Sequence, residues 1–208
     1  MKTNAVNDAL RFPLNTDFDQ EAAELLQEDN NIILAAIDLD RFMLVNDRGG
    51  HEEGDRVLIE SGLYIKSFCD RIGHGKVFRY SGDEFVILFS GAEEKEDVFL
   101  WMDQLRREYP VKTDANPELS LTIGIAACPE DGATVVELLR KSEGAMFRAK
   151  MAGRSRVMLA REEKMVTKTS HYTEQQLKRL TKLSKKENMG EAILLREALD
   201  MLLNKYDV

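Results

Sequence analysis

The chain has 208 residues, 43% of them hydrophobic, and a net charge of −8 at pH 7, which suits one medium-sized domain or one domain with a small appendage. Its longest purely apolar run, residues 32–37, is too short to cross a membrane, and nothing resembles a signal peptide. Cys69 and Cys128 lack the spacing of a metal site and fit a reducing compartment, so we expect a cytoplasmic protein that makes no membrane contact.

Apolar periodicity divides the first 160 residues into helices and strands. We expect, in order, a helix over 17–29, a strand over 31–38, a short helical turn over 40–46, a helix over 53–69, a β-hairpin over 76–90, a helix over 97–109, a strand over 119–127, a helix over 134–152 and a last strand over 156–160. Because strands and helices alternate around a central hairpin, the sequence predicts an α/β (α+β) fold with a mixed sheet and helices on its faces.

The last 45 or so residues have a different character. Residues 165–172 are rich in β-branched side chains and carry no helix signal. Thr173 starts a helix with Gln176 three residues later, close to a capping box. A break at 188–190 precedes a second helix over 191–206, which is apolar around most of its surface. Such a helix needs more partners than one short neighbour offers, and a dimeric core would supply them.

Two acidic clusters carry the chemistry. Asp38 and Asp40 end the apolar strand, and Asp83 and Glu84 lie at the tip of the hairpin, after the turn residues Ser81-Gly82. Carboxylates from two neighbouring strand ends can hold one or two Mg²⁺ ions, and Mg²⁺ held in this way usually handles the phosphates of a nucleotide.

The order and spacing of further motifs add to this pattern. They are Asp40-Arg41-Phe42, Asn46-Asp47, Gly50-His51, Gly54-Asp55 and the segment from Ala149 to Val157. Over about residues 8–160 the chain resembles the GGDEF family of diguanylate cyclases, with an SGDEF variant of the signature. The resemblance implies a palm-like fold, similar to that of nucleotidyl cyclases and polymerases. It also implies GTP as substrate, cyclic di-GMP as product, and Mg²⁺ or Mn²⁺ as cofactor.

By this resemblance, Asp38 binds the metal ions with help from the backbone carbonyl of Leu39. Asp83 is a metal ligand essential to catalysis, and Glu84 assists it as a second catalytic and metal-binding group. Metal ions there would offset phosphate charge and lower the pKa of the attacking hydroxyl. As a bare pattern, Asp38 and Asp40 would also fit a solvated strand end.

The guanine base is expected to be recognised between residues 46 and 55. Asn46 and Asp55 match the family's guanine-reading positions, and a carboxylate suits the N1–H and N2–H₂ donors of guanine but not the edge of adenine. His51 matches the motif and would line the nucleotide pocket, or be structural. Gly50 and Gly54 are expected to let the backbone turn between the two helices.

Lys150 and Arg154 match the family's phosphate-contacting pair, and they would also stabilise a helix C-terminus. Departures from the family's pattern accompany these matches. Ser81 replaces the first Gly of the signature, Met43 replaces a Lys that would lie near the phosphates, and the opening segment 8–16 keeps only part of the family's pattern. We expect slow turnover rather than inactivity.

The tail, residues 161–208, looks like a ribbon-helix-helix module. In that family two chains pair their strands into a ribbon that enters the DNA major groove. On this view Thr167, Thr169 and His171 face double-stranded DNA, or Lys168 and Ser170 with the other strand parity. The tail carries ten basic and eight acidic side chains, a net charge of only +2, which leaves −10 for residues 1–160.

The sequence therefore predicts two domains: residues 1–160, a diguanylate cyclase, and residues 161–208, a module that forms a homodimer and binds DNA. One alternative is a transcription regulator whose GGDEF domain binds GTP or a cyclic dinucleotide without turning it over. A third possibility makes the tail a dimer clamp only.

Overall fold

The computed structural model describes residues 3–10, 12, 15–28, 31–91, 94–161, 168–187 and 190–206. The chain divides into two compact units, Met1–Glu163 and Lys164–Val208. Each unit is a separate body and is described by itself. In the part of the chain that the structure describes, no helix is long and apolar enough to span a membrane.

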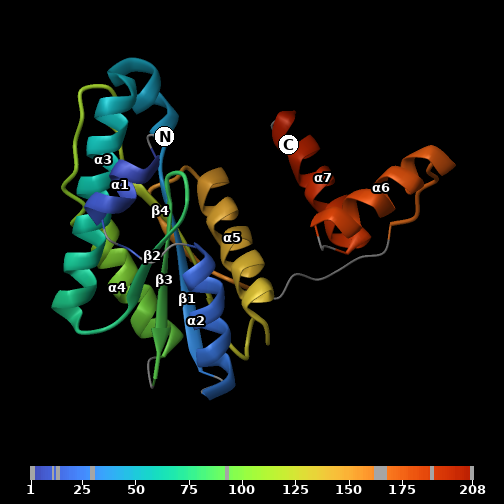
Figure 1. The fold of residues 1–208 in the computed structure, drawn as a ribbon, viewed down its shortest axis with the longest axis horizontal. Helices are drawn as coiled ribbons and strands as arrows, with labels where there is room; N and C mark the ends of the chain where they lie inside the picture. Colours follow the sequence, from blue (N-terminus) through green and yellow to red (C-terminus); the bar gives the residue numbers. More distant parts are fainter. Residues whose placement is uncertain are drawn as a thin grey trace. The chain divides into compact units, whose positions relative to one another are not determined.

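The first unit is a five-stranded sheet with helices on both faces (Figure 1). Its elements are α1 (Thr3–Leu10), α2 (Asn15–Glu28), β1 (Ile32–Leu39), α3 (Phe42–Ile72), β2 (Lys76–Ser81), β3 (Glu84–Ser90), α4 (Lys95–Arg107), β4 (Leu121–Ala127), α5 (Val135–Met151) and β5 (Val157–Leu159). The strand order is β2-β3-β1-β4-β5, with β1 antiparallel to β3 and β4 and only β5 parallel to its neighbour. The mixed α/β fold expected from the sequence is confirmed.

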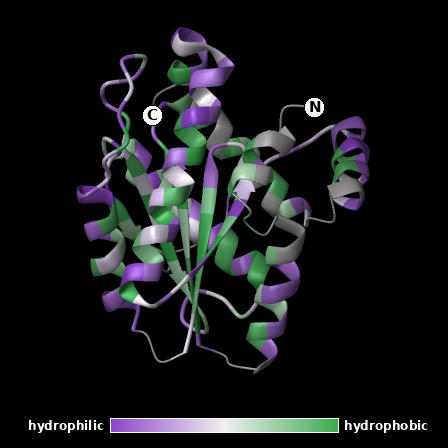
Figure 2. Cartoon of the chain, turned by 60° about the vertical axis from the view of Figure 1, so that its left-hand side comes forward, coloured by the Kyte–Doolittle hydropathy of each residue, from purple (hydrophilic) through white to green (hydrophobic). Residues whose placement is uncertain are grey.

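The central strand β1 explains the two layers of helices. All eight of its residues are buried, because its alternating side chains enter a different hydrophobic core on each face. Ile33, Ala35 and Ile37 pack in the core that α1, α3 and α4 cover, and Ile32 and Leu34 pack in the core beneath α2 and α5. Figure 2 shows the resulting hydrophobic strands between helices that turn hydrophilic residues outward.

The predicted turn and helix between residues 40 and 69 form one continuous element, α3, with a kink. Gly50 has φ 79° and ψ 172°, a conformation that interrupts the helix and favours glycine, as expected. Gly54 was expected to serve the same purpose, and this was wrong. It lies within the helix after the kink, and a Cβ there would come 2.1 Å from Oδ1 of Asn46. Gly54 is therefore needed for close approach, not for a turn.

Other element bounds agree with the sequence to within a few residues, with one addition. α1 was not expected as a helix. Its Val6 and Leu10 are buried in the same core as the inner face of α3. Tertiary packing of this kind stabilises helices too short to form alone.

The second unit contains α6 (Glu174–Glu187) and α7 (Glu191–Lys205). The capping box is present: Thr173 Oγ1 accepts from the backbone N–H of Gln176 at 3.2 Å, and Gln176 Oε1 accepts from the N–H of Thr173 at 2.9 Å. Residues 168–172, within the expected strand region, have no regular secondary structure in this single chain. A ribbon would take its strand hydrogen bonds from a second chain.

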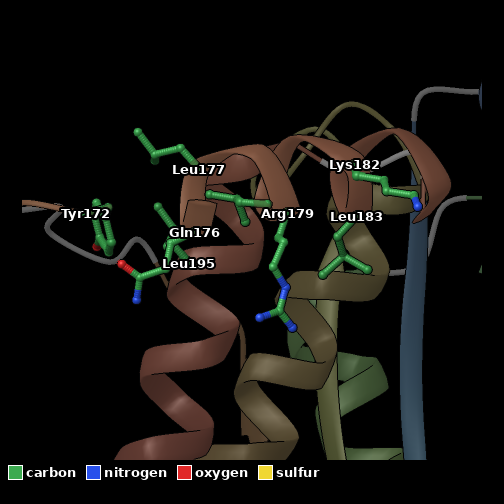
Figure 3. Close-up of a pocket in the computed structure, with 8 residues that line it drawn as sticks. Tyr172, Gln176, Leu177, Arg179, Lys182, Leu183 and Leu195 are labelled. Atoms are coloured by element: carbon green, nitrogen blue, oxygen red, sulfur yellow. The ribbon is translucent and has the colours of Figure 1, made fainter. Parts of the chain in front are cut away.

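Leucines remain exposed on this helix pair. Leu177 and Leu183 of α6 are 43% and 42% exposed, and Leu199 and Leu202 of α7 are 52% and 51% exposed. Figure 3 shows a hollow in this unit, lined by side chains of α6 that include Leu177 and Leu183, and by Leu195 of α7. Apolar surface of this extent on two short helices is typical of a surface that another molecule covers.

Candidate functional site

The two acidic clusters come together at one end of the sheet. β1 and β3 are neighbours, and Asp38 is the direct cross-strand partner of Glu84. Asp83 precedes Glu84 in the tight turn of the hairpin, where Gly82 has φ 37°. Asp38 is only 8% exposed, and the other two carboxylates are half-buried. The structure thus places three acidic side chains on two adjacent strand ends.

Lys150, in the last turn of α5, reaches this acidic group. Its Nζ lies 2.7 Å from Oδ2 of Asp38. Burial raises the pKa of Asp38, and the hydrogen bond and charge of Lys150 oppose that shift. Burial also raises the pKa of Glu84, and the neighbouring Asp38 adds to it. Negative charges gathered in a partly buried site are unfavourable on their own and stabilise any cation placed among them.

The donor set suits a divalent cation that is shared with a ligand. Within the described residues, no group of three or more His, Cys, Asp or Glu side chains is gathered closely enough to hold a metal by itself. Mg²⁺ is usually bound through one or two carboxylates plus substrate phosphates, not by an all-protein cage. Asp38, Asp83 and Glu84 provide such carboxylates, and the ammonium of Lys150 on Asp38 already demonstrates that the site accepts a cation.

Arg79, which the sequence analysis missed, supports the turn that carries Asp83. Its Nε and Nη2 donate to the carbonyl of Gly82 at 3.2 and 2.8 Å, and its Nη1 donates to Oδ1 of Asn7 on α1 at 2.6 Å. Burial lowers the pKa of this guanidinium, while Asp55 and Asp83 oppose the shift through their charges. The only sequence signal was a cation three residues before the turn glycine, which is too common to single out.

The guanine-reading candidates lie around the kink of α3. Asn46 is half-buried against Gly54, the residue next to the half-buried Asp55. The structure therefore brings Asn46 to the backbone beside Asp55. His51 is exposed just after Gly50.

The phosphate candidates Lys150 and Arg154 lie at and just beyond the C-terminus of α5. Arg154 is exposed and has φ 61°. Met43, which replaces the Lys expected near the phosphates, is 71% exposed at the start of α3.

Asp40 does not join the acidic group that its spacing from Asp38 suggested. It is 2% exposed, and its carboxylate accepts hydrogen bonds from Ser120, Thr122 and Ser155. The pair of acids at the end of β1 is thus split: Asp38 faces the candidate site, while Asp40 is bonded within the protein. Leu39, between them, has its side chain fully buried, and its backbone lies in β1 opposite Leu121 of β4.

The candidate DNA-contacting residues belong to the other unit. Thr169 and His171 are exposed in a segment without regular secondary structure, and so are Lys168 and Ser170. Thr167 lies outside the described residues.

Comparison with known proteins matches residues 9–156 to a family described as "Diguanylate cyclase, GGDEF domain". The biofilm architecture maintenance protein MbaA of Vibrio cholerae is 33% identical over 170 residues, which cover 75% of this chain and 21% of MbaA. The diguanylate cyclase DgcZ of Escherichia coli is 30% identical over 162 residues, 76% of this chain and 53% of DgcZ. The chain therefore spans between about a fifth and about a half of the length of these relatives.

Solved structures give the same result for the fold. The GGDEF domain of YfiN (TpbB) from Pseudomonas aeruginosa superposes with a TM-score of 0.66 at 29% identity, covering 74% of this chain and 99% of that one. The coiled coil and GGDEF domain of DgcB from Caulobacter crescentus, solved in complex with c-di-GMP, has a TM-score of 0.64 at 24% identity, over 74% of this chain and 84% of that one. The family match ends at residue 156, before the second unit begins.

Proposed function

The chain belongs to the GGDEF family of diguanylate cyclase domains, and we propose that it condenses two molecules of GTP into cyclic di-GMP. The observation that carries the proposal is the meeting of Asp38, Asp83 and Glu84 on adjacent strand ends with Lys150 beside them. In the reaction, the 3′-hydroxyl of each GTP attacks the α-phosphorus of the other, two phosphodiester bonds form, and two pyrophosphates leave.

The acidic group has two tasks in this proposal. Asp38, Asp83 and Glu84, with the carbonyl of Leu39, hold one or two Mg²⁺ or Mn²⁺ ions. A divalent cation bound there supplies charge neutralisation at the phosphates and a lower pKa for the attacking hydroxyl. Glu84 also assists Asp83 as a second catalytic group.

The remaining residues bind and orient the substrate. Asp55 accepts from N1–H and N2–H₂ of guanine, and Asn46 bonds the same base edge. Lys150 and Arg154 contact the phosphates. Adenine would leave the Asp55 carboxylate without donors, so we expect GTP to be strongly preferred over ATP.

We further propose that the second unit joins two copies of the chain through a ribbon-helix-helix arrangement that binds double-stranded DNA. The support is the order of a segment without regular secondary structure, a capped helix and an apolar helix, together with the exposed leucines of α6 and α7. Thr167, Thr169 and His171 would face the DNA groove. A permanent dimer would raise the local concentration of two cyclase domains to about the millimolar range, which helps because each domain supplies half of the product site.

A second candidate is a GGDEF domain that binds GTP or cyclic di-GMP without turnover. The observation that favours it is Met43, an exposed apolar side chain where the family pattern places a cation near the phosphates. Incubation of the purified chain with GTP and Mg²⁺ or Mn²⁺, followed by chromatography, separates the two candidates. Product from the wild type and none from a folded Asp83→Asn variant is the expected result. Tight GTP binding without product would establish the binding-only function instead.

The tail is tested by ending the chain at Arg161. We expect monomers, weaker cyclase activity and no retention of a labelled DNA duplex at low salt. A truncated chain that still dimerises at micromolar concentration with full activity would refute the coupling. A full-length dimer that binds no DNA would reduce the tail to a clamp.

A further inference from the structure

Asp40 is a buried carboxylate that the proposed reaction does not use. Its Oδ2 accepts from Ser120 Oγ at 2.6 Å and from the backbone N–H of Ser155 at 3.1 Å, and its Oδ1 accepts from Thr122 Oγ1 at 2.6 Å. It is 2% exposed and lies two residues after Asp38. A buried charge is tolerated only where donors of this kind replace its lost hydration.

These bonds join three segments that are distant in the sequence. The N–H of Asp40 donates to the carbonyl of Ser120 at 2.9 Å, which ties the end of β1 to the segment before β4. The N–H of Ser155, which donates to Asp40, also donates to Oγ1 of Thr122, the second residue of β4, at 3.0 Å. One backbone amide after α5 is therefore held by the side chains of Asp40, directly after β1, and Thr122 of β4.

That amide belongs to an unusual loop. Gly153, Arg154 and Ser155 all have positive φ, at 107°, 61° and 46°. This region is uncommon for arginine and serine, and such residues persist where their surroundings fix the backbone. The bonds to Ser155 directly follow Arg154, whose own N–H donates to the carbonyl of Ala149 at 3.0 Å. The exposed Arg154 thus projects from a backbone that is fixed on both sides.

We propose that Asp40 is a positioning residue for the triphosphate. It ties the loop that carries Arg154 to the end of β1 that carries Asp38, and so sets the spacing between the phosphate-binding cation and the cation-binding carboxylate. The inference rests on the proposed function, which assigns Asp38 and Arg154 those tasks. The two acids at the end of β1 then have different roles: Asp38 faces the ligand, and Asp40 holds the loop that carries Arg154.

Asp131 provides a matched control. Its side chain is also nearly inaccessible, at 4% exposed, and accepts from a backbone N–H, that of Ala127 at 2.8 Å, and it forms an ion pair with the buried Lys95 at 2.6 Å. It follows the far end of β4, whereas the near end of β4 pairs with the end of β1 that carries Asp38. Substituting Asp131 therefore tests loss of a buried, bonded carboxylate at the end of the sheet opposite the candidate site.

The experiment compares Asp40→Asn, Thr122→Val and Asp131→Asn by calorimetric titration with Mg²⁺ present. The ligands are a GTP analogue with a methylene bridge between the α- and β-phosphorus, which cannot react, and GMP, which lacks the outer phosphates. We expect Asp40→Asn to weaken analogue binding about tenfold, because a displaced Arg154 loses a charged hydrogen bond, and to leave GMP binding nearly unchanged. Thr122→Val should act in the same direction, and Asp131→Asn should lower the unfolding midpoint without changing either affinity.

Amide hydrogen exchange gives a second readout that needs no ligand. The N–H of Ser155 should exchange faster in Asp40→Asn than in the wild type and should be unaffected in Asp131→Asn. Wild-type affinity of Asp40→Asn for the analogue, or equal losses for the analogue and GMP, would overturn the positioning role and leave the proposed function standing. A wild-type chain that binds neither ligand would overturn both. If Asp40→Asn does not fold, Thr122→Val decides by the same comparison.

Discussion

Replacing Gly54 with alanine should weaken GTP binding without weakening the fold. A Cβ at this position would lie 2.1 Å from Oδ1 of Asn46, 3.1 Å from its Cγ and 3.4 Å from Cζ of Phe42. The contact with Oδ1 is too short to persist, so the amide of Asn46 must move by about 1 Å or more to reach an ordinary separation. The substitution therefore displaces a guanine-reading side chain while leaving its chemistry intact.

The two effects have opposite signs and can be measured separately. Alanine in place of glycine inside a helix adds up to about 1 kcal/mol to the free energy of unfolding. Loss of two hydrogen bonds from Asn46 to guanine costs about 1–3 kcal/mol of binding, which corresponds to an increase in Kd of about 5- to 150-fold. Thermal unfolding and titration with an unreactive GTP analogue provide both quantities on one protein sample.

Two controls make the reasoning refutable. In α5, a Cβ added at Gly144 would have its nearest neighbour, Nη1 of Arg148, at 3.8 Å. Gly144→Ala should therefore increase the free energy of unfolding and leave the affinity for the analogue unchanged. In an Asn46→Ala background, Gly54→Ala should add no further loss. The proposed contact would be refuted if Gly54→Ala weakened binding equally in the Asn46→Ala background, or if Gly54→Ala alone bound the analogue with wild-type affinity.

Three further predictions concern ionisable groups. Burial raises the pKa of Glu84, so the contribution of Glu84 to folding stability is present at low pH and is lost as the pH rises through the folded-state pKa. Glu84→Gln should therefore raise Tm at pH 7, and it should also lower cyclase activity. An equal gain in Tm at pH 3 would contradict this. Lys150 lowers the pKa of Asp38, so Lys150→Met should move the carbon-13 titration of the Asp38 carboxyl to higher pH, and an unchanged midpoint would argue against the ion pair in solution. Burial raises the pKa of Cys69 to about 12, so mass spectrometry should find this thiol modified by an aromatic disulfide at pH 8 only as the protein unfolds, not on mixing.

The fold was predictable because its strongest signals are local. The apolar run 32–37 forms a strand that is buried on both faces, and a tight Ser-Gly turn between apolar runs forms the β2–β3 hairpin. α1 was missed because its stability comes from packing of Val6 and Leu10 against distant residues. Periodicity over eight residues is too short a signal to predict such a helix.

The candidate site was predictable in part, and the reason lies in long-range contacts. Sequence spacing grouped Asp38 with Asp40, but the hydroxyls that bond Asp40 lie about 80 residues further along the chain. Gly54 carries no positive φ, and only the folded helix reveals that it makes room for Asn46. Arg79 supports the Asp83 turn through a backbone carbonyl, a contact that leaves no motif in the sequence.

The strand order also bears on how copies of this protein can associate. β2 and β5 are the outer strands of the sheet, and outer strands with free backbone groups invite another chain to pair with them. β5 has only three residues, while β2 carries the exposed Lys76 and a register shift between Arg79 and Ser81. Short length, an outward lysine and an irregular register each discourage strand addition. The outer strands of this sheet are thus poorly suited to pair with another copy, so association of the first unit with itself would have to use its helical faces and loops.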